Sequence, residues 1–337
     1  MNQLQSKLNI PSFSDVYSDY FSIGAAINQR TIESSKQLLT RHFNSITAEN
    51  EMKPENLQPN ENKFSFEKAD QFVAFAEEHN MKMRGHTLVW HNQTPDWMFK
   101  EQDGSDASRE LLLDRMKTHI STVVGRYQGR IHSWDVVNEV IDDSEVLFLR
   151  KSNYLEIVGE DFIEKAFRFA HEADSKALLF YNDYNECHPQ KRDKIYKLVK
   201  SLIEKQVPIH GIGMQGHWNL TSPSLDNIRA AIEKYASLGL QIQLTELDVS
   251  VFDTTDGRTD LKEPTTEMIA LQEERYEQLF SMLREYRDVI SSVTFWGVAD
   301  DYTWLDNFPV KGRKNWPLLF DVNQLPKQAL QKITSFR

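Results

Sequence analysis

The sequence predicts an α/β fold, a (β/α)8 TIM barrel in which residues 1–337 form a single domain. The first observation is that apolar, β-prone runs alternate eight times with amphipathic stretches of helical period, and eight such units close a parallel barrel. The second is the length of 337 residues, since barrels of this kind commonly run to about 250 residues or more. The third is that no linker rich in Pro, Gly or Ser divides the chain.

Each expected strand is a short apolar run, and each expected helix repeats its apolar residues with helical spacing. Strands are expected at residues 21–27, 45–49, 83–89, 133–138, 177–182, 211–216, 241–245 and 292–296. Helices are expected at residues 66–79, 108–124, 160–173, 191–205, 225–238, 265–287 and 326–333. An open doubly wound sheet is the competing fold, but such sheets usually carry a Gly-rich phosphate turn after the first strand, and Gly24-Ala25-Ala26 is not one.

Charge and composition limit the classes of partner. The net charge is −11 and no block of basic residues occurs, which argues against binding to nucleic acid or to an anionic membrane. No stretch approaches the ~18 apolar residues of a membrane span, and residues 1–17 lack the pattern of a signal peptide. The single cysteine, Cys187, excludes an internal disulfide. We therefore expect a soluble, cytoplasmic protein, while the sequence predicts nothing about its oligomeric state.

Polar residues gather where the expected strands end. In chain order they are Glu49, Asn50, Lys53, His86, Trp90, His91, Asn138, Glu139, Asn182, Asp183, Tyr184, Gln215, His217, Glu246, Asp248, Trp296 and Trp304. Polar groups are costly in a core, and in a barrel the C-terminal ends of all eight strands open on one face. The pattern therefore predicts a pocket at that face.

Two glutamates are the most informative members of this group. Glu139 closes the run HSWDVVNEV, and Glu246 lies at the end of LQIQLTELD. Alone, a glutamate at a strand end is more often a solvated charge or an ion-pair partner. If they lie on opposite walls of one barrel mouth, two carboxyl groups can act as a retaining glycosidase. One protonates the leaving oxygen while the other attacks the anomeric carbon from the opposite face. Residue type alone does not indicate which glutamate has which role.

His217 is expected to lie between Glu246 and Asp248, which share one side if their strand continues. Two acids so close would raise each other's pKa, and an imidazole between them would keep Glu246 ionised. The alternative is that His217 is a core histidine whose ring nitrogens are hydrogen-bonded.

Lys53 also allows two interpretations: it is either a surface lysine or a donor to sugar hydroxyls. Four aromatic residues also allow two interpretations, because each could pack in the core or stack on a pyranose face. They are Trp90, Tyr184, Trp296 and Trp304.

A metal site is the competing chemistry. His86, His91 and His217 could join Glu246 as ligands, but the sequence has no HExxH motif and no HxH pair on one strand. We therefore expect neither a metal nor a cofactor.

These residues lie in segments that resemble glycoside hydrolase family 10, the endo-β-1,4-xylanases, over nearly the whole chain. The matching segments, in order, are TAENEMKPE (47–55), RGHTLVWHNQTPDW (84–97), WDVVNE (134–139), YNDYN (181–185), GIGMQGHW (211–218), LTELD (244–248) and FWGVADDYTWL (295–305). The resemblance implies a (β/α)8 barrel that hydrolyses internal β-1,4-xylosidic bonds of xylan or xylo-oligosaccharides with retention of anomeric configuration.

By the same resemblance, Glu139 matches the general acid/base and Glu246 the nucleophile. The residues that match the subsite of the attacked sugar are His86, Asn138, Gln215 and His217, with Asp248 supporting His217. Those that match the glycone side are Glu49, Asn50, Lys53, Trp90, Gln93, Trp296 and Trp304. Asn182 and Tyr184 match the wall near the cleavage point and the aglycone side. The sequence shows no pattern of a binding module or a leader, and by the same resemblance we expect a member of the intracellular branch that trims short xylo-oligosaccharides.

Two other functions compete with this one. A related barrel β-1,4-glucanase would carry the same two glutamates, but Lys53, His86 and the Trp296/Trp304 pair favour xylose, because bulky indoles leave little room for a hydroxymethyl group. A non-catalytic sugar-binding barrel normally lacks one catalytic carboxylate, and both are present here.

Overall fold

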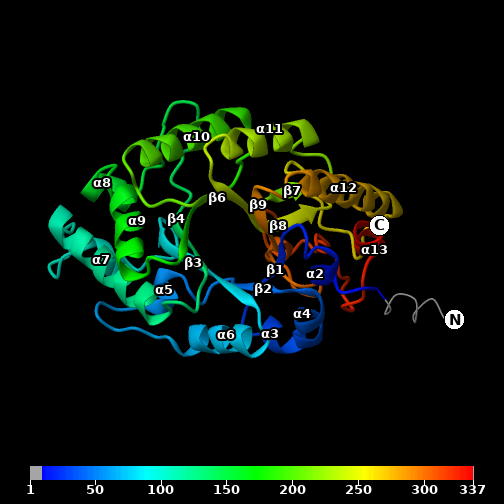
Figure 1. Ribbon diagram of the computed structural model, residues 1–337, viewed down its shortest axis with the longest axis horizontal. Coiled ribbons are helices and arrows are strands. Elements are labelled where there is room, and N and C mark those ends of the chain that lie inside the picture. The colour runs from blue at the N-terminus through cyan, green and yellow to red at the C-terminus, as the bar shows by residue number, and fades with distance from the viewer. Residues whose placement is uncertain (1–9, 337) are drawn as a thin grey trace.

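Eight parallel strands close into a barrel in the computed structural model, which describes residues 10–336 (Figure 1). They are β1 (Ser22–Ile27), β2 (Ser45–Ala48), β3 (Lys82–Trp90), β4 (Ser133–Asn138), β5 (Leu178–Asp183), β6 (Gly211–Met214), β8 (Gln241–Ser250) and β9 (Ile290–Phe295). Neighbouring strands pair in order from β6 back to β1, then β1 pairs with β9, and β8 pairs with both β9 and β6. The predicted barrel is confirmed.

The sixth and seventh strands differ from their predicted bounds. The sixth is interrupted after Met214 and resumes as the short strand β7 (His217–Asn219), which pairs with the far end of β8. The break coincides with Gly216, whose φ of +77° is a left-handed conformation that glycine adopts readily. The seventh strand, β8, continues to Ser250 rather than ending at Thr245, so Glu246 and Asp248 both lie within it, and both carboxylates contact His217.

Helices surround the barrel, as Figure 1 shows. They are α2 (Phe13–Val16), α3 (Thr31–Ser34), α4 (Lys36–His42), α5 (Pro54–Leu57), α6 (Glu67–Glu78), α7 (Arg109–Arg126), α8 (Asn153–Val158), α9 (Phe162–Ala173), α10 (Pro189–Glu204), α11 (Leu225–Ala236), α12 (Thr266–Glu285) and α13 (Gln328–Thr334), with 3-10 turns η1 (Asp96–Phe99) and η2 (Trp304–Asp306). The seven predicted helices are present with small shifts at their ends. The helices α3 and α4 were not predicted, because their mostly polar sequence buries few apolar side chains, chiefly Ile32 and Leu39.

Side-chain caps explain where several of these helices begin. A hydroxyl oxygen accepts a hydrogen bond from a backbone N–H three residues on at Ser108, Ser152, Ser224 and Thr265, the caps of α7, α8, α11 and α12. Each cap satisfies a backbone donor that has no partner within the helix and contributes about 1 kcal/mol.

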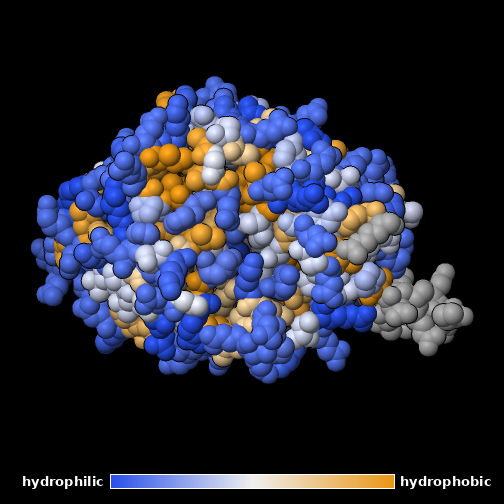
Figure 2. All heavy atoms as spheres, viewed as in Figure 1, coloured by the Kyte–Doolittle hydropathy of each residue, from blue (hydrophilic) through white to orange (hydrophobic). Residues whose placement is uncertain are grey.

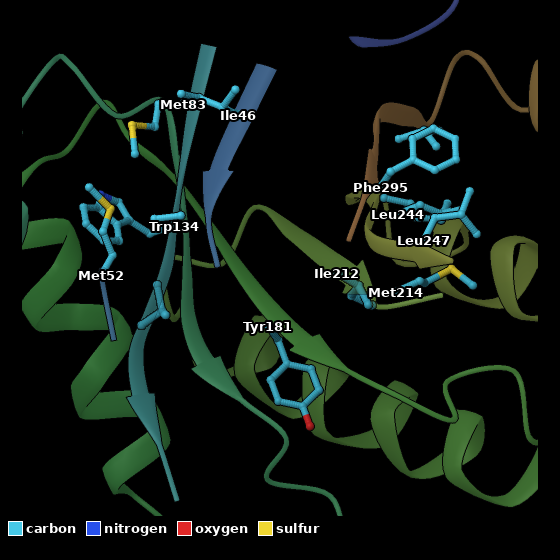
Figure 3. Packing of buried hydrophobic residues seen from close by; sticks show 14 of the residues in the cluster. Ile46, Met52, Met83, Trp134, Tyr181, Ile212, Met214, Leu244, Leu247 and Phe295 are labelled. Carbon is cyan, nitrogen blue, oxygen red and sulfur yellow. The ribbon is translucent and has the colours of Figure 1, made fainter. Parts of the chain in front are cut away.

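The apolar core lies between the strands and the helices. Figure 3 shows Trp134, Tyr181, Leu244 and Phe295 projecting from their strands into this layer. A Cβ on Gly85 would lie 2.0 Å from the Trp134 ring, so this contact requires glycine. In the space-filling view, hydrophobic atoms show inside the ring of helices, and the rim is mostly hydrophilic (Figure 2).

No helix among residues 10–336 is long and apolar enough to cross a membrane. Residues 1–9, part of the segment in which a signal peptide was sought, lie outside the described residues.

Buried polar side chains link β3, β4 and β8 within the barrel. The Arg84 guanidinium is fully buried. Its Nη2 donates to Asp135 Oδ1 at 2.6 Å, and its Nε donates to Gln243 Oε1 at 2.7 Å. The other carboxylate oxygen of Asp135 lies 2.9 Å from Nδ1 of His86. This chain of polar contacts supports the floor of the site described next.

Candidate active site

A cleft of about 640 Å³ opens at the C-terminal ends of the strands. The side chains that line it are Glu49, Asn50, Lys53, His86, Trp90, Asn92, Gln93, Asn138, Glu139, Tyr184, Asn185, Gln215, His217, Glu246, Trp296, Trp304 and Phe308. The structure therefore brings both glutamates and nearly all of the predicted binding residues to one surface. Of the residues predicted at the strand ends, His91, Asn182, Asp183 and Asp248 do not line it.

Glu246 is held by hydrogen bonds to both of its carboxylate oxygens. It projects from β8 and is only 5% exposed. Its Oε2 lies 3.0 Å from Nε2 of His217, and its Oε1 accepts from Nδ2 of Asn182 at 3.0 Å. Nδ1 of His217 lies 2.9 Å from Oδ2 of Asp248. The imidazole thus bridges the two carboxylates, as the hypothesis for His217 required.

This bridge determines the charges at neutral pH. Burial alone would raise the pKa of Glu246, but the hydrogen bond from His217 and the nearby imidazole of His86 lower that pKa to about 2. Burial alone would lower the pKa of His217, but the Asp248 carboxylate and then Glu246 raise it to about 10. A protonated imidazole therefore lies between two carboxylates, and Glu246 stays ionised over the physiological range.

Glu139 is in the opposite electrostatic situation. It is the first residue after β4, and its carboxylate accepts from Nε1 of Trp90 at 2.7 Å and from Nε2 of Gln215 at 2.9 Å. Burial raises the pKa of Glu139, and the negative charges of Asp183 and Glu246 add to this effect, while the two hydrogen bonds oppose it. A carboxyl group with a raised pKa and one with a lowered pKa suit the acid and the nucleophile of a double displacement.

Polar side chains after β2 and β3 form one half of the cleft. The Lys53 ammonium is buried and donates to Asn50 Oδ1 at 2.9 Å and to Gln93 Oε1 at 2.7 Å. Burial lowers the pKa of Lys53, an effect that the charge of Glu246 opposes. Glu49 accepts from Asn28 at 2.7 Å. These groups are held in place before any ligand arrives and offer donors and acceptors suited to sugar hydroxyls.

Indole rings form the wall above this half. The Trp296 ring lies edge-on to His86, with their centroids 5.3 Å apart. Nε1 of Trp304 donates to Asp248 at 2.8 Å, so Asp248 orients both this ring and His217. Phe308 stacks on Trp304 with centroids 4.9 Å apart and an interplanar angle of 19°. The wall is apolar and flat, and it suits the C–H face of a pyranose.

Asn182 does not line the cleft, although it was predicted to bind substrate. Its side chain is fully buried. Its Nδ2 donates to Asn138 and Glu246, and its Oδ1 accepts from Thr245 at 2.6 Å. These contacts make it a support for the two residues that do line the cleft.

Several residues of the site were not predicted. Asn92, Asn185 and Phe308 lie on loops, where no periodic pattern marks the side chains that face a pocket. Asp135 could have been found, because it is a charged residue inside the apolar run of β4 and is fully buried.

Two of the three histidines considered as metal ligands are otherwise engaged. Both ring nitrogens of His217 contact carboxylates, and Nδ1 of His86 contacts Asp135. Within residues 10–336 no group of three or more His, Cys, Asp or Glu side chains is placed to hold a metal ion.

Comparison with known proteins gives the same picture. The sequence model of glycosyl hydrolase family 10 matches residues 12–336. The chain is 57% identical to endo-1,4-beta-xylanase B of Paenibacillus barcinonensis over 96% of its own length and 98% of that protein. It is also 57% identical to an endo-1,4-beta-xylanase of Geobacillus stearothermophilus, over 97% of its length and 99% of that protein. The crystal structure of xylanase XynB from Paenibacillus barcinonensis, complexed with a conduramine derivative, matches with a TM-score of 0.96 and 56% identity, over 97% of this chain and 98% of the other.

Proposed function

The chain belongs to glycosyl hydrolase family 10, and from this premise we propose that it is an endo-1,4-β-xylanase with Glu139 as acid/base and Glu246 as nucleophile. The observation that carries the proposal is the pair of glutamates in one cleft whose pKa values are shifted in opposite directions, upward for Glu139 and downward to about 2 for Glu246. A retaining glycosidase requires this division between a protonated and an ionised carboxyl group.

In the first step, the Glu246 carboxylate attacks the anomeric carbon and forms a covalent xylosyl ester. The bond from that carbon to the glycosidic oxygen breaks, and the oxygen takes the proton of Glu139 as it leaves. The ionised state of Glu246 is maintained by His217, whose Nε2 lies 3.0 Å from its carboxylate. Glu139 is left as a carboxylate.

In the second step, the Glu139 carboxylate takes a proton from a water molecule whose oxygen attacks the same carbon. The ester bond to Glu246 breaks, and the nucleophile regains its negative charge. Two inversions at one carbon give net retention. Glu139 is protonated again, so the cycle closes.

The preference for xylose over glucose rests on the wall of the cleft. Trp296, Trp304 and Phe308 crowd its upper side, where the hydroxymethyl group of a glucose unit would need room. The two glutamates do not discriminate, because a β-1,4-glucanase of related fold would use the same pair. Comparison of substrates therefore has to decide this point.

Proton NMR of the reaction with a short β-1,4-xylo-oligosaccharide tests substrate, bond and stereochemistry together. We expect β-anomeric reducing ends to appear before mutarotation begins, and cello-oligosaccharides of equal length to react far more slowly. If the α-anomer appears first, the site is inverting and Glu246 is not the nucleophile. If cello-oligosaccharides are cleaved and xylo-oligosaccharides are not, the barrel and both glutamates stand but the substrate is a glucan.

Replacing His217 by Gln should move the pH profile. The substitution removes the positive charge that helps to lower the pKa of Glu246, so that pKa rises toward the value favoured by burial. Because Glu246 must be ionised, the acidic limb of the kcat/KM profile should shift to higher pH, while the alkaline limb, which reports loss of the Glu139 proton, stays in place. His79→Gln, at the end of α6 and outside the cleft, is the matched control. An unshifted acidic limb in a folded His217→Gln variant would contradict the role of the bridge.

Three further features belong to this proposal. We expect residues 1–337 to act as one catalytic domain, short xylo-oligosaccharides to be preferred over polymer, and the enzyme to work in the cytoplasm. Rates on xylan and on xylo-oligosaccharides of increasing length, measured with one preparation, test the preference for short substrates.

A further inference from the structure

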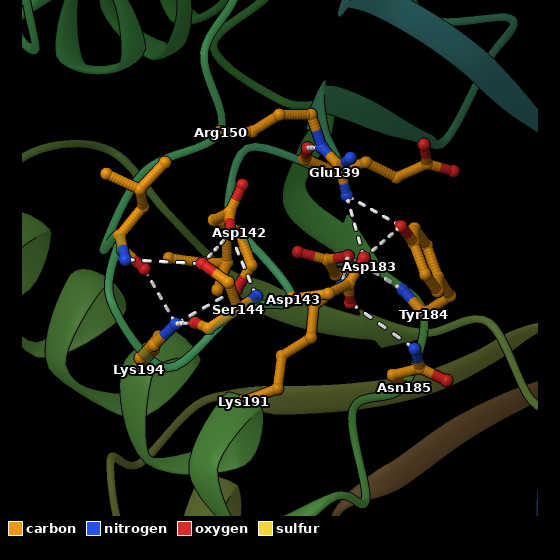
Figure 4. A network of polar contacts seen from close by, with 12 residues as sticks. Glu139, Asp142, Asp143, Ser144, Arg150, Asp183, Tyr184, Asn185, Lys191 and Lys194 are labelled. Carbon is orange, nitrogen blue, oxygen red and sulfur yellow. Dashed lines mark hydrogen bonds and ion pairs between the residues drawn. The ribbon is translucent and has the colours of Figure 1, made fainter.

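A network of charged side chains next to Glu139 connects the loop after β4 to α10 and β5 (Figure 4). Arg150 lies at the edge of this network beside Glu139, and Asp143 lies at its centre, in contact with Arg150, Tyr184, Asn185 and Lys191. The Arg150 side chain is not part of the cleft lining, but it shares a small neighbouring cavity with Glu139 and Trp90. The catalytic steps above make no use of it.

Arg150 contacts the backbone from which the acid/base side chain projects. Glu139 has a φ of +60°, a left-handed conformation that residues with a side chain rarely adopt. Its backbone N–H donates to the carbonyl of Asn182 at 2.9 Å, and its own carbonyl accepts from Nε of Arg150 at 2.9 Å. These two hydrogen bonds hold the residue on both sides of its Cα.

The other end of the guanidinium reaches a second residue that lines the cleft. Nη2 of Arg150 donates to the Tyr184 hydroxyl at 2.6 Å, and that hydroxyl donates to Asp143. Tyr184 follows β5 and lines the cleft. One side chain thus connects the acid/base residue with a side chain of the aglycone wall.

The network is anchored on buried charges. Nζ of Lys191 lies 2.7 Å from Asp143 and 2.9 Å from Asp183, and the side chains of Lys191 and Asp183 are 3% and 1% exposed. The Tyr181 hydroxyl donates to the other oxygen of Asp183. Lys191 and Asp183 are paired and shielded from water, so their geometry is more tightly held than that of a surface ion pair, whereas the Asp143 side chain, which joins them to Tyr184, is 39% exposed.

We propose that Arg150 is a positioning residue for the acid/base: by holding the strained backbone of Glu139, it places the carboxyl group for proton transfer to the leaving oxygen. The inference rests on the proposed function. General acid catalysis requires the donor within hydrogen-bond reach of the oxygen, and small displacements of a catalytic group lower rates steeply.

The test uses aryl β-xylobiosides of equal size whose phenols differ in acidity, because a poor leaving group needs the proton and 2,4-dinitrophenolate does not. For Arg150→Met we expect kcat/KM on the least acidic phenol to fall by roughly 10- to 100-fold. On the 2,4-dinitrophenyl substrate, kcat/KM should change by less than about 3-fold. The dependence of log kcat/KM on leaving-group pKa therefore becomes steeper. Arg150→Lys, which retains one donor, should give an intermediate slope.

Two controls separate positioning from general damage. Arg130→Met removes an arginine that pairs with Glu77 at 2.7 Å far from the cleft, and it should leave every substrate unaffected. Tyr184→Phe removes the hydroxyl contact while keeping the bond from Arg150 to Glu139, so any loss should be parallel across the series.

Each outcome is decisive. A steeper slope in Arg150→Met supports the proposal, whereas a parallel loss or no change overturns it. Glu139→Ala, measured with the same series, shows which inference has failed. If Glu139→Ala has a steeper slope and Arg150→Met does not, the acid/base assignment stands and the positioning role falls. If Glu139→Ala has an unchanged slope, both fall.

Discussion

Replacing Glu246 by Ala or Gln should lower kcat on xylo-oligosaccharides by about 10⁴-fold or more, because no other side chain can form the covalent intermediate. Glu246 is buried, and the Gln variant keeps its volume and one oxygen that can accept from His217 or from Asn182. The loss should therefore occur without loss of the fold. Kinetics and thermal unfolding on the same samples check both statements.

A second buried glutamate provides the matched control for this experiment. Glu186 is 1% exposed, accepts a hydrogen bond from Nε1 of Trp218 at 3.0 Å and does not line the cleft. Glu186→Gln removes a buried carboxyl group without touching the reacting centre, so it should keep its turnover. Near-normal activity in a folded Glu246→Gln variant would show that another group is the nucleophile.

Replacing Glu139 by Ala should produce losses that depend on the substrate. With a poor leaving group, kcat/KM should fall by about 10²- to 10⁴-fold, since the first step loses its proton donor. With 2,4-dinitrophenyl xylobioside, kcat/KM should be nearly preserved, but kcat should fall because the second step has lost its base.

Added azide tests whether Glu139 is the general base of the second step. It needs no base to attack the xylosyl ester, and the space left by the Glu139 side chain admits it. We expect azide to raise kcat of Glu139→Ala on the activated substrate and to give the β-glycosyl azide, because azide displaces the ester to Glu246, whereas any azide product of Glu246→Ala should be the α-anomer. Absence of any azide effect would contradict the acid/base assignment.

Where the spacing of apolar residues marks a strand or a helix, the predicted element agreed with the structure. The strand β4 has its predicted bounds, Ser133–Asn138, because an apolar run ending in Asn-Glu marks both the strand and its end. The helices α3 and α4 carry little apolar periodicity and were not found. The far half of β8 was missed because Glu246 was taken to close the strand, whereas its partner strands extend the pairing to Ser250.

The pocket was predictable for a topological reason. In a parallel barrel, all strands run in one direction, so residues that follow different strands meet at one mouth. Glu139 and Glu246 are more than a hundred residues apart in the chain, and their meeting follows from the order of strands and helices. The pattern alone was enough to place them together.

The direction of each side chain and its charge depend on neighbours that no local pattern specifies. Asn182 follows the same rule as Glu139, yet barrel closure places its amide beneath Glu246 and away from the cleft. Arg150 lies on a loop, and its contacts to Glu139 and Tyr184 join segments from two strands.

The amino-acid order was thus sufficient for the barrel, for the face that carries the site and for most of the residues that line it, because strand direction and apolar spacing are local properties. The folded chain was needed to decide that His217 bridges Glu246 and Asp248 rather than packing as a core histidine, and to show that the two glutamates have pKa values shifted apart. Burial and hydrogen bonding set those pKa values, and both arise from residues that are distant in sequence and become neighbours when the barrel closes.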